Sequence, residues 1–124
     1  MEKNKIICII EDNSPNRKLF SMLIKKSGYN VADFGTAKDS LDWLSTNNAD
    51  LILLDILLPD MNGPDVLMNI RNIEHLKEAK VVAITGFSST YDREKFLYLG
   101  FDGFLAKPIN TTTFIEEIES YLNK

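Results

Sequence analysis

Five polar residues stand out because each lies at the end of a short apolar run of the type that forms buried strands. They are Glu11, Asp12, Asp55, Thr85 and Lys107. In an open parallel sheet, ligands bind beyond the carboxyl ends of the strands. If these runs are parallel strands, three carboxylates, one hydroxyl and one ammonium group meet at the same edge of the sheet.

Such a cluster is suited to phosphoryl chemistry. Three neighbouring carboxylates repel one another, so at least one pKa should rise unless a cation is present. Mg²⁺ fits because it takes oxygen ligands and typically binds a few carboxylates together with a phosphate. A lysine and a threonine could hold the phosphoryl oxygens, and one carboxylate could attack phosphorus to form an aspartyl phosphate. The protein would contribute mostly positioning and charge neutralisation.

The whole chain alternates between strand-type and helix-type patterns. Strand-type apolar runs lie at Ile6–Ile10, Val31–Phe34, Leu51–Leu54, Val81–Ile84 and Phe104–Ala106. Apolar residues spaced three and four apart follow at Leu19–Ile24, Ala37–Leu44, Val66–Ile70, Phe96–Leu97 and Phe114–Leu122. Residues that favour helix starts are Ser14 before Pro15, Asn62 before Gly63-Pro64, and Asn110 or Thr111. Residues that favour helix ends are Gly28 and Gly100.

These patterns predict an α/β fold of five βα units. The first and third apolar runs lack alternation, which is typical of strands covered by helices on both faces. A closed barrel of eight units would need about twice the length. We therefore expect a doubly wound open parallel sheet, with residues 1–124 as a single domain and no output domain.

Four motifs in chain order resemble the response-regulator receiver family of two-component signalling, and the resemblance covers essentially the whole chain. They are Glu11-Asp12, Asp55 with Leu58-Pro59 and Gly63, Thr85-Gly86, and Lys107-Pro108. The resemblance implies a flavodoxin-like sheet with strand order 2-1-3-4-5. It also implies transfer of a phosphoryl group from a phosphohistidine donor to Asp55.

The family's site residues carry over to this chain as expectations. The implied ligands of Mg²⁺, for which Mn²⁺ is a possible substitute, are Glu11, Asp12, Asp55 and the backbone carbonyl of Leu57. The implied partners of the phosphoryl oxygens are Thr85 and Lys107. The peptide bond between Lys107 and Pro108 is expected to be cis.

The resemblance also implies a conformational switch. Phe104 matches an aromatic residue whose rotation is coupled to the threonine, and the readout face would comprise the fourth helix, fifth strand and fifth helix. The expected partners are a histidine kinase or histidine-phosphotransfer protein and a downstream protein target. The resemblance further implies that Leu57 and Phe87 flank the route of the attacking water. Because neither can hydrogen-bond that water, we expect a long-lived phosphoryl group.

Composition excludes several other classes. The net charge is −4, with 18 acidic and 14 basic residues, and the bases are scattered, so direct nucleic-acid binding is not expected. No apolar run approaches the ~20 residues of a membrane helix. The apolar run after the charged first residues is too short for the h-region of a secretory signal, so we do not expect one. The single cysteine, Cys8, excludes a disulfide scaffold. We expect a soluble, cytoplasmic domain.

Our interpretation is a stand-alone phosphoacceptor that signals through protein contacts and is not an enzyme in the usual sense. One alternative is a receiver module cut from a larger regulator or hybrid histidine kinase. Another is a Mg²⁺-dependent phosphohydrolase with an aspartyl nucleophile. Enzymes of the haloacid-dehalogenase type carry a second Asp two residues after the first, where this chain has Leu57. The third is a scaffold that binds partners without phosphorylation.

Overall fold

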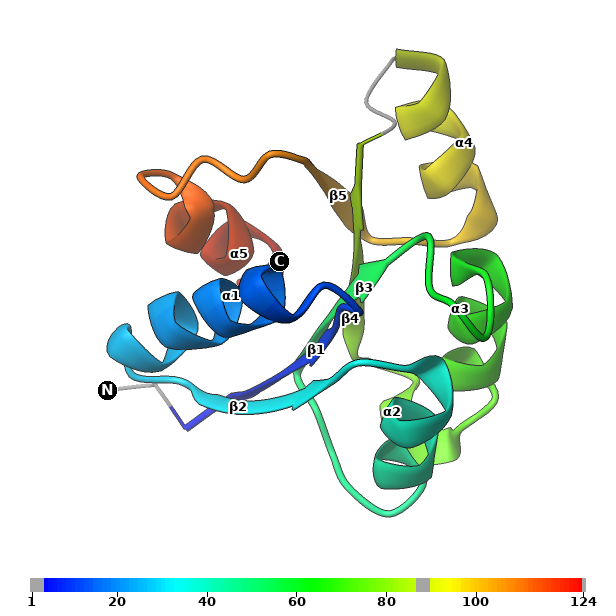
Figure 1. Cartoon of the computed structure of the whole chain (residues 1–124). Coiled ribbons are helices and arrows are strands. Elements are labelled where there is room, and N and C mark those ends of the chain that lie inside the picture. Colours follow the sequence, from blue (N-terminus) through cyan, green and yellow to red (C-terminus); the bar gives the residue numbers. More distant parts are fainter. Residues whose placement is uncertain (1–3, 87–89, 124) are drawn as a thin grey trace.

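A five-stranded parallel sheet forms the centre of the protein, seen here in a computed structural model that describes residues 4–86 and 90–123 (Figure 1). The strands are β1 (Ile6–Ile10), β2 (Asn30–Phe34), β3 (Leu51–Asp55), β4 (Lys80–Thr85) and β5 (Gly103–Ala106). The helices are α1 (Ser14–Lys26), α2 (Ala37–Leu44), α3 (Gly63–Arg71), α4 (Thr90–Leu99) and α5 (Phe114–Leu122), with a short 3₁₀ helix, η1 (Glu74–Leu76). The strand order β2-β1-β3-β4-β5 confirms the predicted doubly wound sheet.

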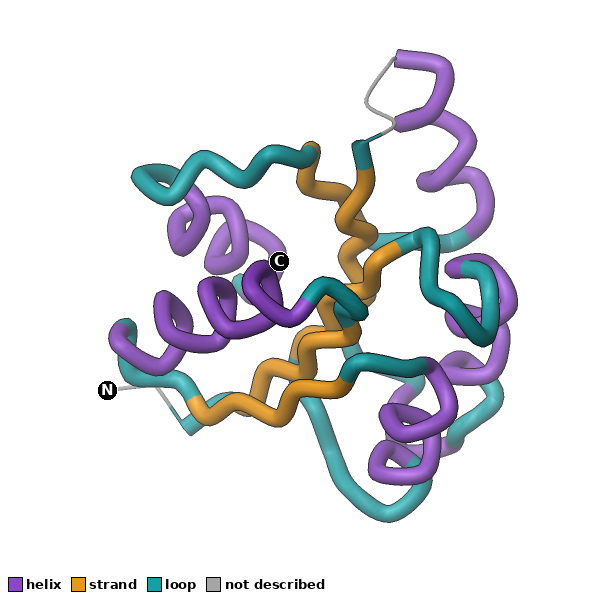
Figure 2. The backbone as a smooth tube through the Cα atoms, in the orientation of Figure 1, coloured by secondary structure: helices purple, strands orange, loops and turns teal. Residues whose placement is uncertain are grey.

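The central strands are apolar because both faces of the sheet are covered. Helices α1 and α5 lie on one face, and α2, α3 and α4 lie on the other (Figure 2). Along β1, Ile7 and Ile9 join the core beneath α1 and α5, whereas Cys8 and Ile10 join the core on the opposite face. All five residues of β3 are buried. This arrangement explains why alternation is absent from these runs.

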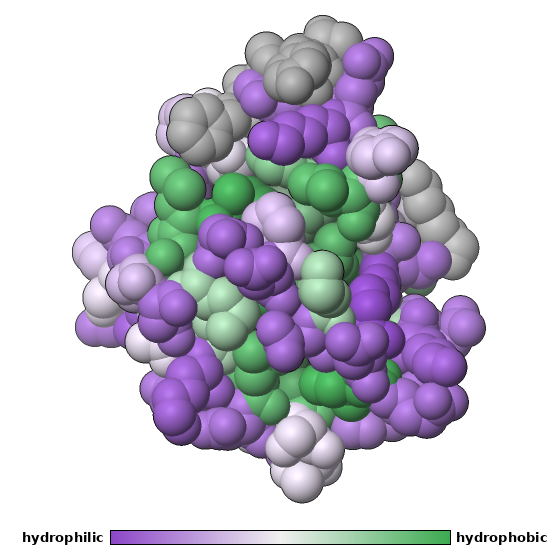
Figure 3. All heavy atoms as spheres, turned by 90° about the vertical axis from the view of Figure 1, so that its right-hand side faces the viewer, coloured by the Kyte–Doolittle hydropathy of each residue, from purple (hydrophilic) through white to green (hydrophobic). Residues whose placement is uncertain are grey.

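The outer surface of α3 and α4 is partly apolar. Figure 3 shows this side of the molecule, where several apolar areas are separated by hydrophilic side chains. Met68 on α3 and Leu97 and Tyr98 on α4 are exposed. Within α4, Phe96 packs into the core beside Phe101. No helix in the described ranges is long and apolar enough to cross a membrane.

The start of α1 differs by one residue from the prediction. Asn13, and not Ser14, caps this helix, because its side-chain oxygen accepts a hydrogen bond from the Asn16 amide at 2.9 Å. Ser14 is therefore the first residue of the helix. Asparagine and serine are both good caps, so residue preference alone does not decide between them.

The other helix boundaries are mostly as expected. Asn62 caps α3 by accepting a hydrogen bond from the Asp65 amide at 3.0 Å. Gly28 and Gly100, which follow α1 and α4, have positive φ angles of 99° and 111°. The predicted cap of α5 is wrong. Asn110 instead accepts from Thr112 in the preceding turn, and the N-cap of α5 is Thr113. The local asparagine turn competes with capping here.

The start of β5 packs closely against α5, which gives a test of the fold. A Cβ atom at Gly103 would overlap the ring of Tyr121, whereas a Cβ atom at Gly86 would meet nothing within 4 Å. We expect Gly103→Ala to lower the free energy of unfolding by about 1–3 kcal/mol, because the ring must move. The matched Gly86→Ala variant should change it by less than about 1 kcal/mol. Urea denaturation measures both, and equal effects would contradict the packing described here.

Candidate functional site

The predicted polar residues meet at the carboxyl ends of the strands. Asp55 and Thr85 are the last residues of β3 and β4. Glu11 and Lys107 directly follow β1 and β5. Parallel pairing brings these ends together, and the amide of Lys107 donates a hydrogen bond to the carbonyl of Thr85 at 2.8 Å. The register of the sheet therefore places these side chains.

Three carboxylates form a tight cluster at this edge. Ligand atoms of Glu11, Asp12 and Asp55 all lie within 4.8 Å of one another. Glu11 is fully buried and Asp55 is 5 % exposed, whereas Asp12 is open to solvent. The sequence prediction that these acids converge is confirmed. Such crowding of negative charge is costly unless positive charge compensates for it.

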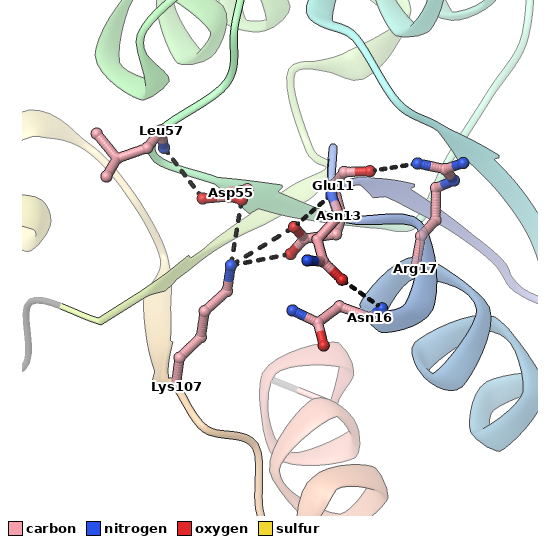
Figure 4. A network of polar contacts seen from close by, with 7 residues as sticks. All are labelled: Glu11, Asn13, Asn16, Arg17, Asp55, Leu57 and Lys107. Atoms are coloured by element: carbon pink, nitrogen blue, oxygen red, sulfur yellow. Dashed lines mark hydrogen bonds and ion pairs between the residues drawn. The ribbon is translucent and has the colours of Figure 1, made fainter.

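Lys107 supplies part of that compensation. Its Nζ atom lies 3.2 Å from Oδ2 of Asp55 and 3.2 Å from Oε1 of Glu11, and the side chain points at both (Figure 4). Burial lowers the pKa of Lys107, but the two carboxylates outweigh burial and raise it overall. Lys107 is therefore charged at neutral pH. The other oxygen of Asp55, Oδ1, accepts a hydrogen bond from the Leu57 amide at 3.0 Å.

The cluster lines an open pocket of about 620 Å³. Its lining residues are Glu11, Asp12, Asn13, Ser14, Asn16, Asp55, Leu57, Thr85, Gly86 and Lys107. Thr85 is 2 % exposed and forms part of the pocket wall. Because Gly86 has no side chain, that part of the wall stays open. The pocket has room for a cation and for an incoming polar group.

A divalent cation fits this set of donors. Oε1 of Glu11 is buried and has no hydrogen-bond partner among the described residues, since the contact with Lys107 is an ion pair without hydrogen-bond geometry. Lys107 contributes one positive charge against three carboxylates. Oxygen donors around a surplus of negative charge are the environment that Mg²⁺ prefers. The chemistry of the site thus leaves a place for a hard cation.

The remaining predicted residues lie around this centre. Leu57 lines the pocket and is 63 % exposed. The Lys107–Pro108 peptide bond is cis, as the resemblance implied. Phe104 lies away from the pocket on β5, with the Arg93 guanidinium 4.5 Å above its ring centre. Phe87 lies outside the described residues.

Sequence reasoning missed two residues that hold the loop between β1 and α1. The Asn13 amide donates to Oε2 of Glu11 at 3.1 Å, and Nη1 of Arg17 donates to the Glu11 carbonyl at 2.8 Å (Figure 4). Ser14-Pro15 predicts the helix start, but the cap is the preceding residue, Asn13. Nothing in the local pattern marks Arg17, because its acceptor belongs to the end of a strand.

One family model and several known proteins match nearly the whole chain. The family model for the response regulator receiver domain matches residues 7–119. The polar-differentiation response regulator DivK of Brucella ovis is 38% identical over 118 residues, which cover 95% of this chain and 96% of that protein. DivK of Brucella anthropi is 37% identical over the same shares of both chains.

Solved structures share the fold. The CheY-like receiver domain protein of Methanospirillum hungatei is 28% identical with a TM-score of 0.86, covering 97% of this chain and 94% of that chain. The chemotaxis response regulator CheY4 of Vibrio cholerae has a TM-score of 0.90 at 20% identity, covering 95% and 98%. The receiver domain of sensor histidine kinase PA1611 from Pseudomonas aeruginosa has a TM-score of 0.86 at 24% identity, covering 98% and 99%, and holds a magnesium ion in its active site cleft.

The buried Glu11 makes stability depend on pH. Burial first, and then the neighbouring Asp55 carboxyl, raise the pKa of Glu11 from 4.5 to about 7, while the Asn13 amide and Lys107 oppose the shift. Between these values the folded chain binds more protons at this residue than the unfolded chain. Without divalent cations, the contribution of Glu11 to stability should therefore fall as pH rises from about 4.5 through 7.

The contribution of Glu11 can be isolated by urea unfolding of the wild type and of Glu11→Gln in the presence of EDTA. The measurements cover pH 5 to 8 because the raised pKa of Glu11 lies in this range. The wild type should lose stability relative to Glu11→Gln as pH rises. Parallel stability curves for the two proteins would show that Glu11 does not titrate in this range.

Proposed function

The chain belongs to the family of response regulator receiver domains, and we propose that Asp55 accepts a phosphoryl group from a phosphohistidine donor in a Mg²⁺-dependent reaction. The observation that carries this proposal is the placement of Asp55. Its carboxylate ends a fully buried strand, opens into the pocket and has Lys107 Nζ 3.2 Å from Oδ2. A carboxylate held in this way is oriented for attack on phosphorus.

The proposed step is a simple displacement. A carboxylate oxygen of Asp55 forms a bond to phosphorus, the bond from phosphorus to the donor imidazole nitrogen breaks, and that nitrogen keeps the electron pair. With a proton on the other ring nitrogen of the donor, the products are an aspartyl phosphate and a neutral histidine. Later attack by water on phosphorus would release inorganic phosphate and restore the Asp55 carboxylate. We propose that both steps are self-catalysed and that the chain does not turn over phosphate monoesters.

The acids and Lys107 have separate roles in this proposal. Glu11 and Asp12, with Asp55 and the Leu57 carbonyl, would hold Mg²⁺, and Glu11 would act directly or through water. When bound, the cation would neutralise charge on the phosphoryl oxygens. Phosphorylation removes the charge of the Asp55 carboxylate and adds about −1.5 to −2 charges on the phosphate. Lys107 would consequently move from Asp55 to a phosphoryl oxygen, and the Thr85 hydroxyl would hydrogen-bond another.

The signal would leave through the face formed by α4, β5 and α5. Phe104 is half-buried on this face, with Arg93 of α4 on one side and Phe96 packed against it. Tyr121 of α5 donates to the Phe104 carbonyl at 3.4 Å. Phe104 has no hydroxyl group, so packing alone would decide how its ring lies. We propose that a histidine kinase or phosphotransfer protein supplies the phosphoryl group in the cytoplasm and that a downstream protein binds this face.

Intact-mass measurement tests the phosphoacceptor. After incubation with acetyl phosphate and Mg²⁺, the wild type should gain one phosphoryl group, and Asp55→Asn should gain none because the nucleophile is absent. Asp42→Asn provides a matched control, since Asp42 lies on α2 outside the pocket and pairs with Lys38. Addition to Asp55→Asn at the wild-type rate would place the acceptor elsewhere.

Phosphoryl lifetime tests the expected effect of Leu57 and Phe87 on the attacking water. Leu57 cannot orient water, and Phe87, outside the described residues, cannot do so either. Leu57→Asn with Phe87→Glu should speed the loss of phosphate about tenfold or more, because a positioned base typically contributes about 10²- to 10⁴-fold. The release of inorganic phosphate measures this rate. Met68→Gln is a control with the same 63% exposure on α3. Unchanged decay in the double variant would refute the role of these residues.

A further inference from the structure

Arg17 connects three segments that meet beside the acidic cluster. It lies in the first turn of α1, where its amide donates to the Asn13 carbonyl at 2.9 Å. Its guanidinium reaches back to the end of β1 and donates to the Glu11 carbonyl at 2.8 Å. Its Nε atom is 4.0 Å from Oδ1 of Asp33 on β2. The side chain is 24% exposed, so this contact is partly shielded from water.

The carbonyl that Arg17 holds belongs to the peptide joining Glu11 to Asp12. On the other side of Glu11, its amide donates to the Phe34 carbonyl of β2 at 3.0 Å. Glu11 is therefore fixed at both its amide and its carbonyl. Because a peptide group is planar, fixing this carbonyl also fixes the direction in which the chain enters Asp12. The side chain of Asp12 itself is exposed, so its placement depends on this backbone.

Gly35 makes room for the guanidinium. A Cβ atom at this position would lie 3.0 Å from Nη1 of Arg17, which is tighter than an ordinary contact. The backbone at Gly35 does not have a positive φ angle, so alanine is compatible with its conformation. The close approach of Arg17, and not the backbone geometry, is thus what a side chain at residue 35 would disturb.

We propose that Arg17 is a positioning residue for the cation site: it orients the Glu11–Asp12 peptide so that both acids face Asp55. This inference rests on the proposed Mg²⁺ site. It makes a prediction opposite in sign to that of simple electrostatics. A positive charge near the cluster repels Mg²⁺, so removal of Arg17 as a mere charge would tighten cation binding. Removal of Arg17 as a positioning group loosens the acids and weakens binding.

The test is Mg²⁺ titration by calorimetry of the unphosphorylated proteins, with urea unfolding to establish the folded fraction. Arg17→Met keeps much of the side-chain packing but removes the donor. Its Kd for Mg²⁺ should rise about tenfold, at the lower end of the effect of removing groups that orient metal ligands. Lys18→Met removes an exposed positive charge from the next position of α1 and serves as the matched control. Its Kd should stay the same or fall slightly.

Gly35→Ala keeps the charge of Arg17 but displaces its guanidinium, so it should also raise the Kd, by a smaller factor. This variant carries the test if Arg17→Met does not fold. A Kd equal to or below the wild-type value in the folded Arg17→Met protein, or in Gly35→Ala if the former is unfolded, would overturn the inference. Failure of the wild type to bind Mg²⁺ would instead remove the proposed cation site itself, so the two failures are distinguishable.

Discussion

Crowding of negative charge at one edge of a buried sheet is the constraint on which the rest of this structure depends. Glu11, Asp12 and Asp55 bring ligand atoms within 4.8 Å of one another, and Lys107 offsets only part of the repulsion. The strands cannot separate to relieve it, because the ladder of backbone hydrogen bonds fixes their ends. The pocket therefore favours added positive charge, as a bound cation would supply.

The two halves of the site are held in different ways. On the β3–β4–β5 side, Asp55 and Thr85 are strand residues, and Lys107 is tied to Thr85 by a backbone hydrogen bond. Their positions follow from the register of the sheet. On the β1 side, the acids lie in a loop that two side chains fix: the Glu11 carboxylate accepts from the Asn13 amide, and the Arg17 guanidinium donates to the Glu11 carbonyl. Long side chains thus do for the loop what strand pairing does for the rest of the site.

Strand β5 links the acidic pocket to the proposed readout surface. Phe104 lies within β5, and Lys107, three residues later, directly follows the end of this strand. Phe104 contacts α4 through Arg93 and Phe96, and its carbonyl accepts a hydrogen bond from Tyr121 of α5. Parallel pairing with β4 keeps β5 in a fixed register. A shift of Lys107 towards a phosphoryl group would therefore act on a strand that both flanking helices already contact.

The amino-acid pattern was enough to predict the βα alternation, the order of the elements and the convergence of Glu11, Asp55 and Lys107. These are consequences of local apolar runs and of the residues that end them, together with the rule that parallel strands end at one edge. The cap at Asn13 and the hydrogen bond from Arg17 to the Glu11 carbonyl became apparent only in the folded chain. The Arg17 contact joins α1 to the residue that follows β1, so it depends on the packing of that helix against the sheet. This packing involves residues from several elements, and no run of neighbouring residues encodes it.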